Sequence, residues 1–158
     1  MKVMEELGVE DREGTHARWV RYVNEYEEGA TVYDGFDRVF EEVRKRGVMQ
    51  AVVSSKARAQ YQIDIVAAGI DRYMSAAVLA DDVSSHKPDP ESLLVCLEQL
   101  GVAAADAIYI GDAASDAEAA RNAGMDFGYA AWGDPTHTEP ANTAWVLEQP
   151  IDILDAVG

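Results

Sequence analysis

The sequence has a single cysteine, no long apolar run and few basic residues, and each scarcity excludes a class of protein. Cys96 has no second cysteine to pair with, so the chain forms no internal disulfide, which fits a reducing compartment. No apolar run approaches the roughly 18 residues that a membrane helix needs. Glu5 and Glu6 stand where a signal peptide would have its apolar stretch. These absences predict a cytoplasmic protein.

Positive charge is also scarce, with 13 Lys and Arg against 29 Asp and Glu and a formal net charge of -16. A field of this sign repels phosphate backbones and anionic lipid, so neither a nucleic acid nor a membrane is expected as a partner. Solubility alone is the simpler explanation of the charge. A small anionic substrate stays compatible with it, because a lysine, backbone amides and a divalent cation act at short range.

The 158 residues, 48% of them apolar, suffice for one domain with a real core. After about residue 34, short apolar runs alternate with helical patterns, and short connections join them. The runs that predict buried strands are 48–53, 76–80, 107–110 and 127–131. The patterns that predict helices are 36–46, 56–68, 89–100, 115–124 and 151–157. This order predicts an α/β fold with a doubly wound parallel sheet that helices cover on both faces.

Residues 1–33 differ from the rest of the chain. They are rich in acids, and Trp19, Tyr22 and Tyr26 fall on one face of a helical pattern. We expect one or two helices outside the sheet here, and a core domain over residues 34–158.

The motif Gly111-Asp112-Ala113-Ala114-Ser115-Asp116 follows a predicted strand and opens a helix. In parallel sheets, ligands bind beyond the carboxyl ends of the strands. Two carboxylates four residues apart at that point can converge on one hard cation, and Mg²⁺ prefers oxygen ligands. The plainer alternative is that Asp112 caps a turn and Asp116 stabilises the helix start. Ser115 and Glu118 would form a capping box for the same helix.

Two other loops offer groups for an anion. Lys87 lies on a proline-stiffened loop, in Lys87-Pro88-Asp89-Pro90, and provides a fixed positive charge for a phosphoryl oxygen. Ser54 and Ser55 follow the first predicted strand, where a hydroxyl and free backbone amides can bind an anion. A solvated lysine and an ordinary helix-capping serine are the structural alternatives.

In their order and spacing, these motifs resemble the haloacid dehalogenase-like (HAD) hydrolase superfamily, in its phosphoglycolate-phosphatase-like branch. The resemblance covers about residue 33 to the end of the sequence. It implies a Mg²⁺-dependent phosphatase acting on a small phosphorylated metabolite. It further implies that Ser54 and Lys87 are catalytic residues, that both bind the phosphate together with Ser55, and that Asp112 and Asp116 are metal ligands.

The family's nucleophile, an aspartate in Asp-x-Asp-Gly-Thr on a buried strand, has no match before Ser54. The nearest string runs from Asp11 to Thr15, but Glu13 replaces the second aspartate, and the residues before it are charged rather than apolar. Residues 1–33 instead resemble the last helices of the family's helical cap. We therefore expect the core to lack its first strand and the phosphatase activity of this chain to be impaired.

Two alternatives remain. A non-catalytic HAD-fold binding or interaction protein would keep the fold without the nucleophile. A phosphoacceptor receiver domain is also doubly wound, but receivers present their acids before the hydroxyl and the lysine. A missing strand would leave backbone groups unpaired, which makes a homo-oligomer plausible in either reading.

Overall fold

In the computed structural model, residue 11 and residues 32–158 are described, and Val32 to Gly158 form one compact unit. The predicted cap over residues 1–33 lies almost wholly outside the described residues. Among the described residues, no helix has the length and apolar character needed to cross a membrane.

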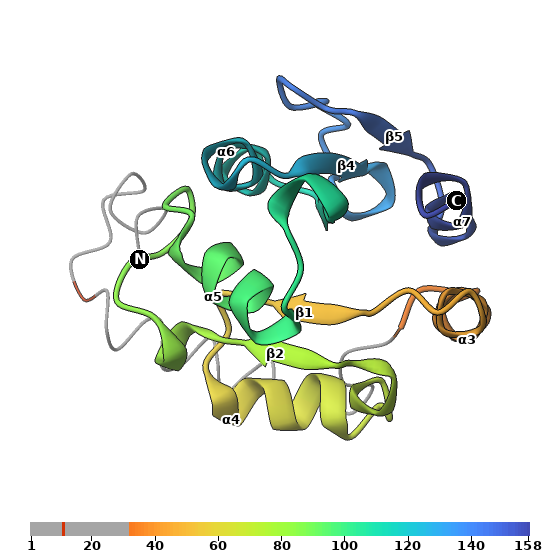
Figure 1. Cartoon of the computed structure of the whole chain (residues 1–158), viewed down its shortest axis with the longest axis horizontal. Helices are drawn as coiled ribbons and strands as arrows, with labels where there is room; N and C mark the ends of the chain where they lie inside the picture. The colour runs from red at the N-terminus through yellow and green to blue at the C-terminus, as the bar shows by residue number, and fades with distance from the viewer. Residues whose placement is uncertain (1–10, 12–31) are drawn as a thin grey trace. The chain divides into compact units, whose positions relative to one another are not determined.

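Helices and strands alternate along this unit (Figure 1). The strands are β1 (Ala51–Val53), β2 (Ala76–Val78), β3 (Ile108–Gly111), β4 (Asp126–Ala130) and β5 (Trp145–Leu147). The α-helices are α3 (Phe36–Lys45), α4 (Arg58–Tyr61), α5 (Glu91–Leu100), α6 (Ala114–Ala123) and α7 (Ile153–Ala156). A π-helical turn over Gln62–Val66 continues α4, and the 3-10 turns are Asp71–Tyr73, Ala80–Asp82, Ala104–Asp106, Ala131–Gly133 and Pro150–Asp152.

All strand pairs in the described part of the chain are parallel, and they form two groups. In the first, β1 pairs with β2, with Val52 opposite Ala77. In the second, β4 lies between β3 and β5, with Tyr109 opposite Phe127 on one side and Tyr129 opposite Val146 on the other. This confirms the predicted α/β fold with parallel strands.

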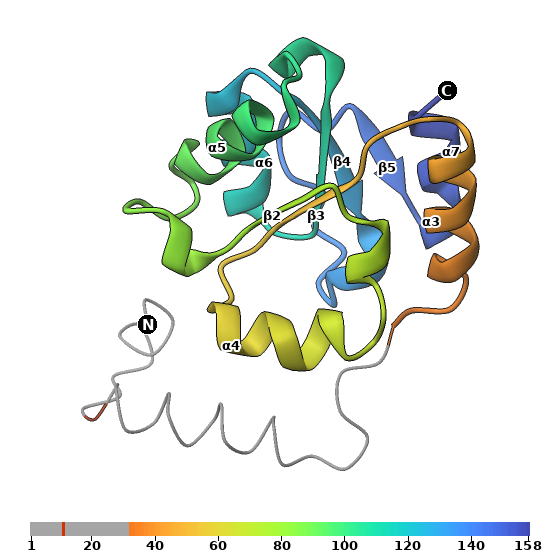
Figure 2. The same ribbon diagram turned by 60° about the horizontal axis from the view of Figure 1, so that its bottom comes forward.

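Helices cover both faces of the strands (Figure 2). On one face, Leu93 of α5 and four alanines of α6 pack against Phe127 and Tyr129 of β4. On the other face, Val39 and Val43 of α3 pack with Leu147 and Ile153. The small alanines bring α6 close to the sheet. Successive side chains of a strand point to opposite faces of the sheet, so the strands contribute to both cores. This is the doubly wound arrangement.

Three local predictions need correction. The predicted helix over residues 56–68 begins later, at Arg58, and continues as the π-helical turn. Asp64 is buried in that turn. Its carboxylate accepts a hydrogen bond from Lys56 and one of 2.9 Å from Gln60. Strand β5 is not among the predicted strands, although Ala144-Trp145-Val146-Leu147 is a short apolar run. In the structure Trp145 and Val146 are exposed and only Leu147 is buried.

The third correction concerns the start of α6. The helix begins at Ala114, so Ser115 lies inside its first turn and does not form the predicted capping box with Glu118. The Asp116 carboxylate caps the helix instead, by accepting a hydrogen bond of 3.2 Å from the Ala113 amide.

Candidate functional site

The predicted site residues lie at the carboxyl ends of the parallel strands. Ser54 and Ser55 directly follow β1, Asp112 directly follows β3, and Lys87 lies on the segment between β2 and α5. Parallel strands end at one edge of a sheet, so the fold delivers these residues to the same side of the molecule.

Ser54 is fixed by its backbone and keeps a usable hydroxyl. Its amide donates to the Val78 carbonyl at 3.0 Å, which prolongs the β1–β2 ladder, and its Oγ accepts a hydrogen bond from the Lys56 amide at 3.2 Å. Because the oxygen is the acceptor in that contact, the hydroxyl proton can be donated to an anion. Ser54 is half-buried and Ser55 is exposed.

Lys87 is a buried cation with two polar partners. Its Nζ donates to Asp116 Oδ1 at 2.6 Å and to the Tyr109 hydroxyl at 2.9 Å, and its side chain is only 14% exposed. Burial by itself lowers the pKa of Lys87, but Tyr109 and Asp116 outweigh burial and raise it above its usual value. Lys87 is therefore a permanent positive charge and not a solvated surface lysine.

The loop that carries Lys87 is tied down on both sides. The Glu91 carboxylate accepts hydrogen bonds from the amides of Ser84 and Ser85, at 3.1 and 2.6 Å. The Asn122 side chain of α6 donates to the Pro88 carbonyl at 3.1 Å, directly after a cis Lys87–Pro88 peptide. The lysine is thus held relative to α6, the helix that also carries Asp116.

Tyr109, which the sequence analysis did not single out, connects the loops. Its hydroxyl donates to the Val53 carbonyl at 3.3 Å, next to Ser54, while it accepts from Lys87. Burial, followed by the nearby Asp116 carboxylate, raises the pKa of Tyr109, so the phenol stays protonated. A hydroxyl between Ile108 and Ile110 in an apolar strand, two residues before Gly111, was the available sequence signal.

The two aspartates of the motif lie in different environments. Asp116 is buried, and both of its oxygens already accept hydrogen bonds, one from Lys87 and one from the Ala113 amide. Asp112 is exposed. Partial burial and the neighbouring Asp116 carboxylate raise the pKa of Asp112, so the two negative charges are close enough to repel each other.

Two glycines leave room for these carboxylates. A Cβ atom on Gly111 would lie 2.6 Å from Asp116 Oδ2, and a Cβ atom on Gly133 would lie 2.6 Å from Asp112 Oδ2. Both distances are far below van der Waals contact. Gly133 lies in the turn after β4, so the backbone of a neighbouring strand end directly borders the Asp112 side chain.

Asp112 and Asp116 supply carboxylate oxygens, the ligand type that Mg²⁺ prefers. Within residue 11 and residues 32–158, no group of three or more His, Cys, Asp and Glu side chains is placed to hold a metal ion by itself. Mg²⁺ usually keeps several waters and takes one or two carboxylates. The exposed Asp112 could hold such an ion directly, with Asp116 beside it.

Charged groups at the ends of β1 and β2 support the neighbouring loop. The Asp82 carboxylate accepts from the Leu79 amide at 2.9 Å and pairs with the Arg58 guanidinium at 2.6 Å. These contacts lower the pKa of Asp82, with the backbone amide as the larger cause. Asp81 accepts from the Arg58 amide at 2.5 Å, so both acids fasten the start of α4 to the end of β2.

The chain matches known proteins over most of its length. Residues 1–130 match the family model described as haloacid dehalogenase-like hydrolase. The chain is 34% identical over 148 residues to the pyrophosphatase PpaX of Bacillus velezensis, and the match covers 90% of this chain and 64% of that protein. It is 30% identical over 122 residues to the phosphoglycolate phosphatase of Xylella fastidiosa, covering 75% of this chain and 53% of that protein.

Solved structures give the same answer. A Lactobacillus plantarum protein, solved as a candidate phosphoglycolate phosphatase, superposes with a TM-score of 0.85 at 31% identity, covering 98% of this chain and 75% of that one. A HAD-superfamily hydrolase from Geobacter sulfurreducens superposes with a TM-score of 0.69 at 27% identity, covering 80% and 56%. The chain thus spans roughly half to two thirds of the curated relatives quoted above. On its motifs, its fold and these matches, the chain belongs to the haloacid dehalogenase-like hydrolases.

Proposed function

We propose that this chain carries the phosphate- and metal-binding half of a Mg²⁺-dependent, cytoplasmic phosphatase that acts on a small phosphorylated metabolite. One observation carries the proposal: the hydrogen bonds from the Val53 carbonyl through Tyr109 to Lys87 and Asp116 join three loops at one edge of the sheet. Relatives named pyrophosphatase and phosphoglycolate phosphatase support a small phosphorylated molecule as the substrate.

Each residue has a distinct role in this proposal. The Ser54 hydroxyl and the Ser55 amide donate to phosphoryl oxygens, and Lys87 neutralises the charge that develops on them. Asp112 holds Mg²⁺, and Asp116 lies beside it and keeps Lys87 in position. When bound, Mg²⁺ would offset the negative charge of the phosphoryl group.

We expect the 158-residue chain by itself to bind phosphate but to turn over little substrate. In the resembled family the nucleophile is the first aspartate of Asp-x-Asp-Gly-Thr on an apolar strand, and no segment before Ser54 combines such a strand with this motif. Asp11 is the nearest candidate. It is exposed and lies outside any helix or strand.

Isothermal titration with inorganic phosphate, with and without MgCl₂, tests the binding. We expect Mg²⁺-dependent phosphate binding that Lys87→Met weakens at least about tenfold, because a charge-assisted hydrogen bond is lost. Lys45→Met is the matched control, since Lys45 is an exposed lysine paired with Glu42 on α3. Equal affinities of both variants and the original chain would contradict the proposal.

Hydrolysis of p-nitrophenyl phosphate tests the turnover. We expect none above background, with phosphate binding retained. Measurable turnover that Asp11→Asn abolishes would show that Asp11 is the nucleophile and that residues 1–33 do not form a cap.

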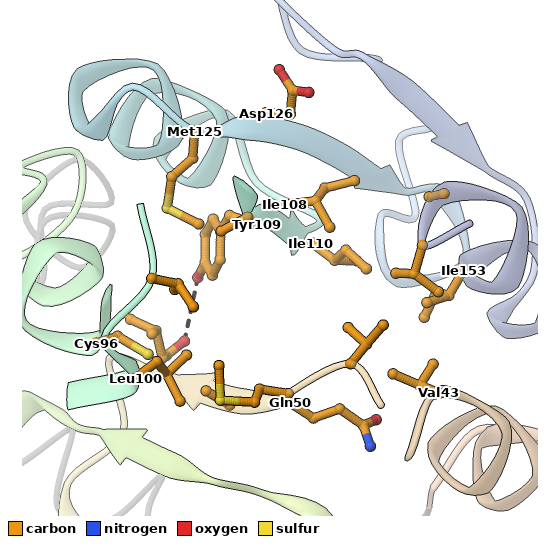
Figure 3. A pocket seen from close by; sticks show the side chains of 18 of the residues that line it. Val43, Gln50, Cys96, Leu100, Ile108, Tyr109, Ile110, Met125, Asp126 and Ile153 are labelled. Carbon is orange, nitrogen blue, oxygen red and sulfur yellow. Dashed lines mark hydrogen bonds between the residues drawn. The ribbon is translucent and has the colours of Figure 1, made fainter. Parts of the chain in front are cut away.

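A non-catalytic binding protein of the same fold is the second candidate function. One observation favours it, a largely apolar open cavity of about 830 Å³ that residues of β1 and β3 line (Figure 3). Phosphate binding that Lys87→Met leaves unchanged, together with binding of a partner in this cavity, would favour this alternative.

A further inference from the structure

The π-helical turn after α4 holds a buried carboxylate that the proposed function does not use. The Asp64 side chain is only 6% exposed, and each of its oxygens has a hydrogen-bond partner. One oxygen pairs with the Lys56 ammonium, and the other accepts a hydrogen bond of 2.9 Å from Gln60. A buried charge is costly unless it is paired, and π-helical turns are rare and frequent at functional sites. Both facts direct attention to what the pair holds in place.

Lys56 belongs to the turn that carries the proposed phosphate ligands. It directly follows Ser54 and Ser55, and its backbone is hydrogen-bonded at two points. The Lys56 amide donates to Ser54 Oγ at 3.2 Å, and the Lys56 carbonyl accepts from the Ala80 amide at 3.1 Å. Because the amide occupies one acceptor site of the Ser54 oxygen, the place of Lys56 decides in which direction the hydroxyl proton is free to point.

The Lys56 side chain is drawn away from the phosphate side of this turn. Asp64 lies beyond the first turn of the helical segment that begins at Arg58, and Figure 2 shows this segment leading back from the end of β1. The arrangement repeats a device of the neighbouring loop, where Lys87 pairs with the buried carboxylate of Asp116. In each case a lysine next to the proposed site is fastened to an aspartate of a helical segment.

We propose that Asp64 is a positioning residue that acts through Lys56 on the phosphate-binding turn. The ion pair holds the Lys56 side chain back along the helical segment and thereby keeps the Lys56 amide against Ser54 Oγ. Ser54 then donates its proton outward to a phosphoryl oxygen, while the Lys56 ammonium stays on Asp64 and does not touch the phosphate. This inference rests on the proposed function for the role of Ser54.

Asp64→Asn separates positioning from direct contact of Lys56 with phosphate. Positioning predicts that the affinity for inorganic phosphate in MgCl₂ falls about threefold to tenfold, because the turn loses its anchor. Direct contact predicts the opposite, since release from Asp64 would offer the Lys56 ammonium to the phosphate. Isothermal titration of the full chain measures the difference. Unchanged or stronger phosphate binding in Asp64→Asn would overturn the proposal.

Variants of Lys56 supply the double-mutant cycle and the rescue. Lys56→Met should weaken phosphate binding as much as Asp64→Asn, and the double variant should be no weaker than either, because each change removes the same pair. Lys56→Arg keeps a cation for Asp64 and should bind phosphate like the original chain. Lys45→Met, which breaks an exposed pair on α3, is the matched control. Effects of the two single variants that add up would contradict the proposal, and so would equal affinities of Lys56→Met and Lys56→Arg, which decide the matter if Asp64→Asn fails to fold.

Amide hydrogen exchange tests the positioning without phosphate. In Asp64→Asn, the amides of Lys56 and Ala80, which donate the two hydrogen bonds of the turn, should exchange faster, and those of β4 should not. Equal acceleration in β4 would show a general loss of stability and would overturn the proposal. Phosphate binding that Lys87→Met leaves unchanged counts against the proposed function, whereas unchanged exchange at Lys56 and Ala80 counts against this inference, so the two failures are distinguishable.

Discussion

Asp112 and Asp116 show how two carboxylates of one motif can take different roles. Asp116 is buried and has a partner on each oxygen, so it acts as a structural anion that holds Lys87. Asp112 is exposed, and its pKa is raised by partial burial and by the neighbouring Asp116 carboxylate. A bound cation would offset the repulsion between the two negative charges. Mg²⁺ binding should therefore depend on Asp112, and folding should depend on Asp116.

Substituting each aspartate separates these roles. We expect Asp112→Asn to weaken Mg²⁺ binding at least about tenfold without lowering the melting temperature. Asp116→Asn should lower stability by about 3 kcal/mol, because it removes the carboxylate charge that pairs with the buried Lys87 ammonium. Titration calorimetry with MgCl₂ and thermal melts measure the two effects. Equal loss of stability in both variants would contradict this division.

Gly133 positions Asp112 from outside the motif. Gly133→Ala should displace the Asp112 side chain, because the new Cβ would lie 2.6 Å from its Oδ2. We expect Mg²⁺ affinity to fall several-fold, with a melting temperature close to that of the unchanged chain. Gly101→Ala, at a position with nothing within 4 Å, is the control and should leave Mg²⁺ affinity unchanged. Unaltered Mg²⁺ binding in Gly133→Ala would show that Asp112 can move aside freely.

At the scale of elements, the turn after β4 depends on one carboxylate. Asp134 accepts hydrogen bonds from the Tyr129 hydroxyl at 2.7 Å and from the amides of Thr136 and Thr138, at 2.8 and 2.9 Å. The Thr136 side chain, followed by Tyr129 and these amides, holds the pKa of Asp134 far below its usual value of 3.8. Burial, together with Asp134, raises the pKa of Tyr129 to about 12.

A depressed carboxyl pKa makes the turn sensitive to acid. The stabilisation from Asp134 is present above pH 3.8, the usual pKa, and is lost as the pH falls toward the lower folded value. Asp134→Asn should therefore lower the melting temperature at pH 7, and the difference from the original chain should shrink at pH 2. Thermal melts at both pH values measure this. A difference that grows in acid would contradict the prediction.

At the scale of the whole molecule, the net charge of -16 acts against compactness. The helix-surface ion pairs, such as Arg44 with Glu41 and Arg121 with Glu118, are exposed and contribute little. Screening of the overall repulsion should therefore outweigh the loss of these pairs when salt is added.

We accordingly expect NaCl to raise the melting temperature progressively up to about 0.5 M, where the Debye length has fallen to a few ångströms. Melts with MgCl₂ at matched ionic strength separate this general effect from specific binding, and Asp112→Asn should lose only the Mg²⁺-specific part. A melting temperature that falls with NaCl would show that local ion pairs dominate.

The sequence by itself determined the alternation of strands and helices, the parallel sheet and the family, because apolar runs, glycine helix ends and the Gly-Asp-x-x-x-Asp motif are local patterns. It also placed Ser54 and Asp112 directly after strands and Lys87 on a loop that follows a strand, and parallel topology brings such segments to one edge of the sheet. Strand β5, which contains most of the short apolar run from Ala144 to Leu147, is not among the predicted strands. Only the tertiary structure decided that Tyr109 joins the loops, that Asp116 anchors Lys87, and that a cavity separates β1 from β3. Each of these depends on contacts between residues far apart in the chain, and no local pattern encodes such contacts.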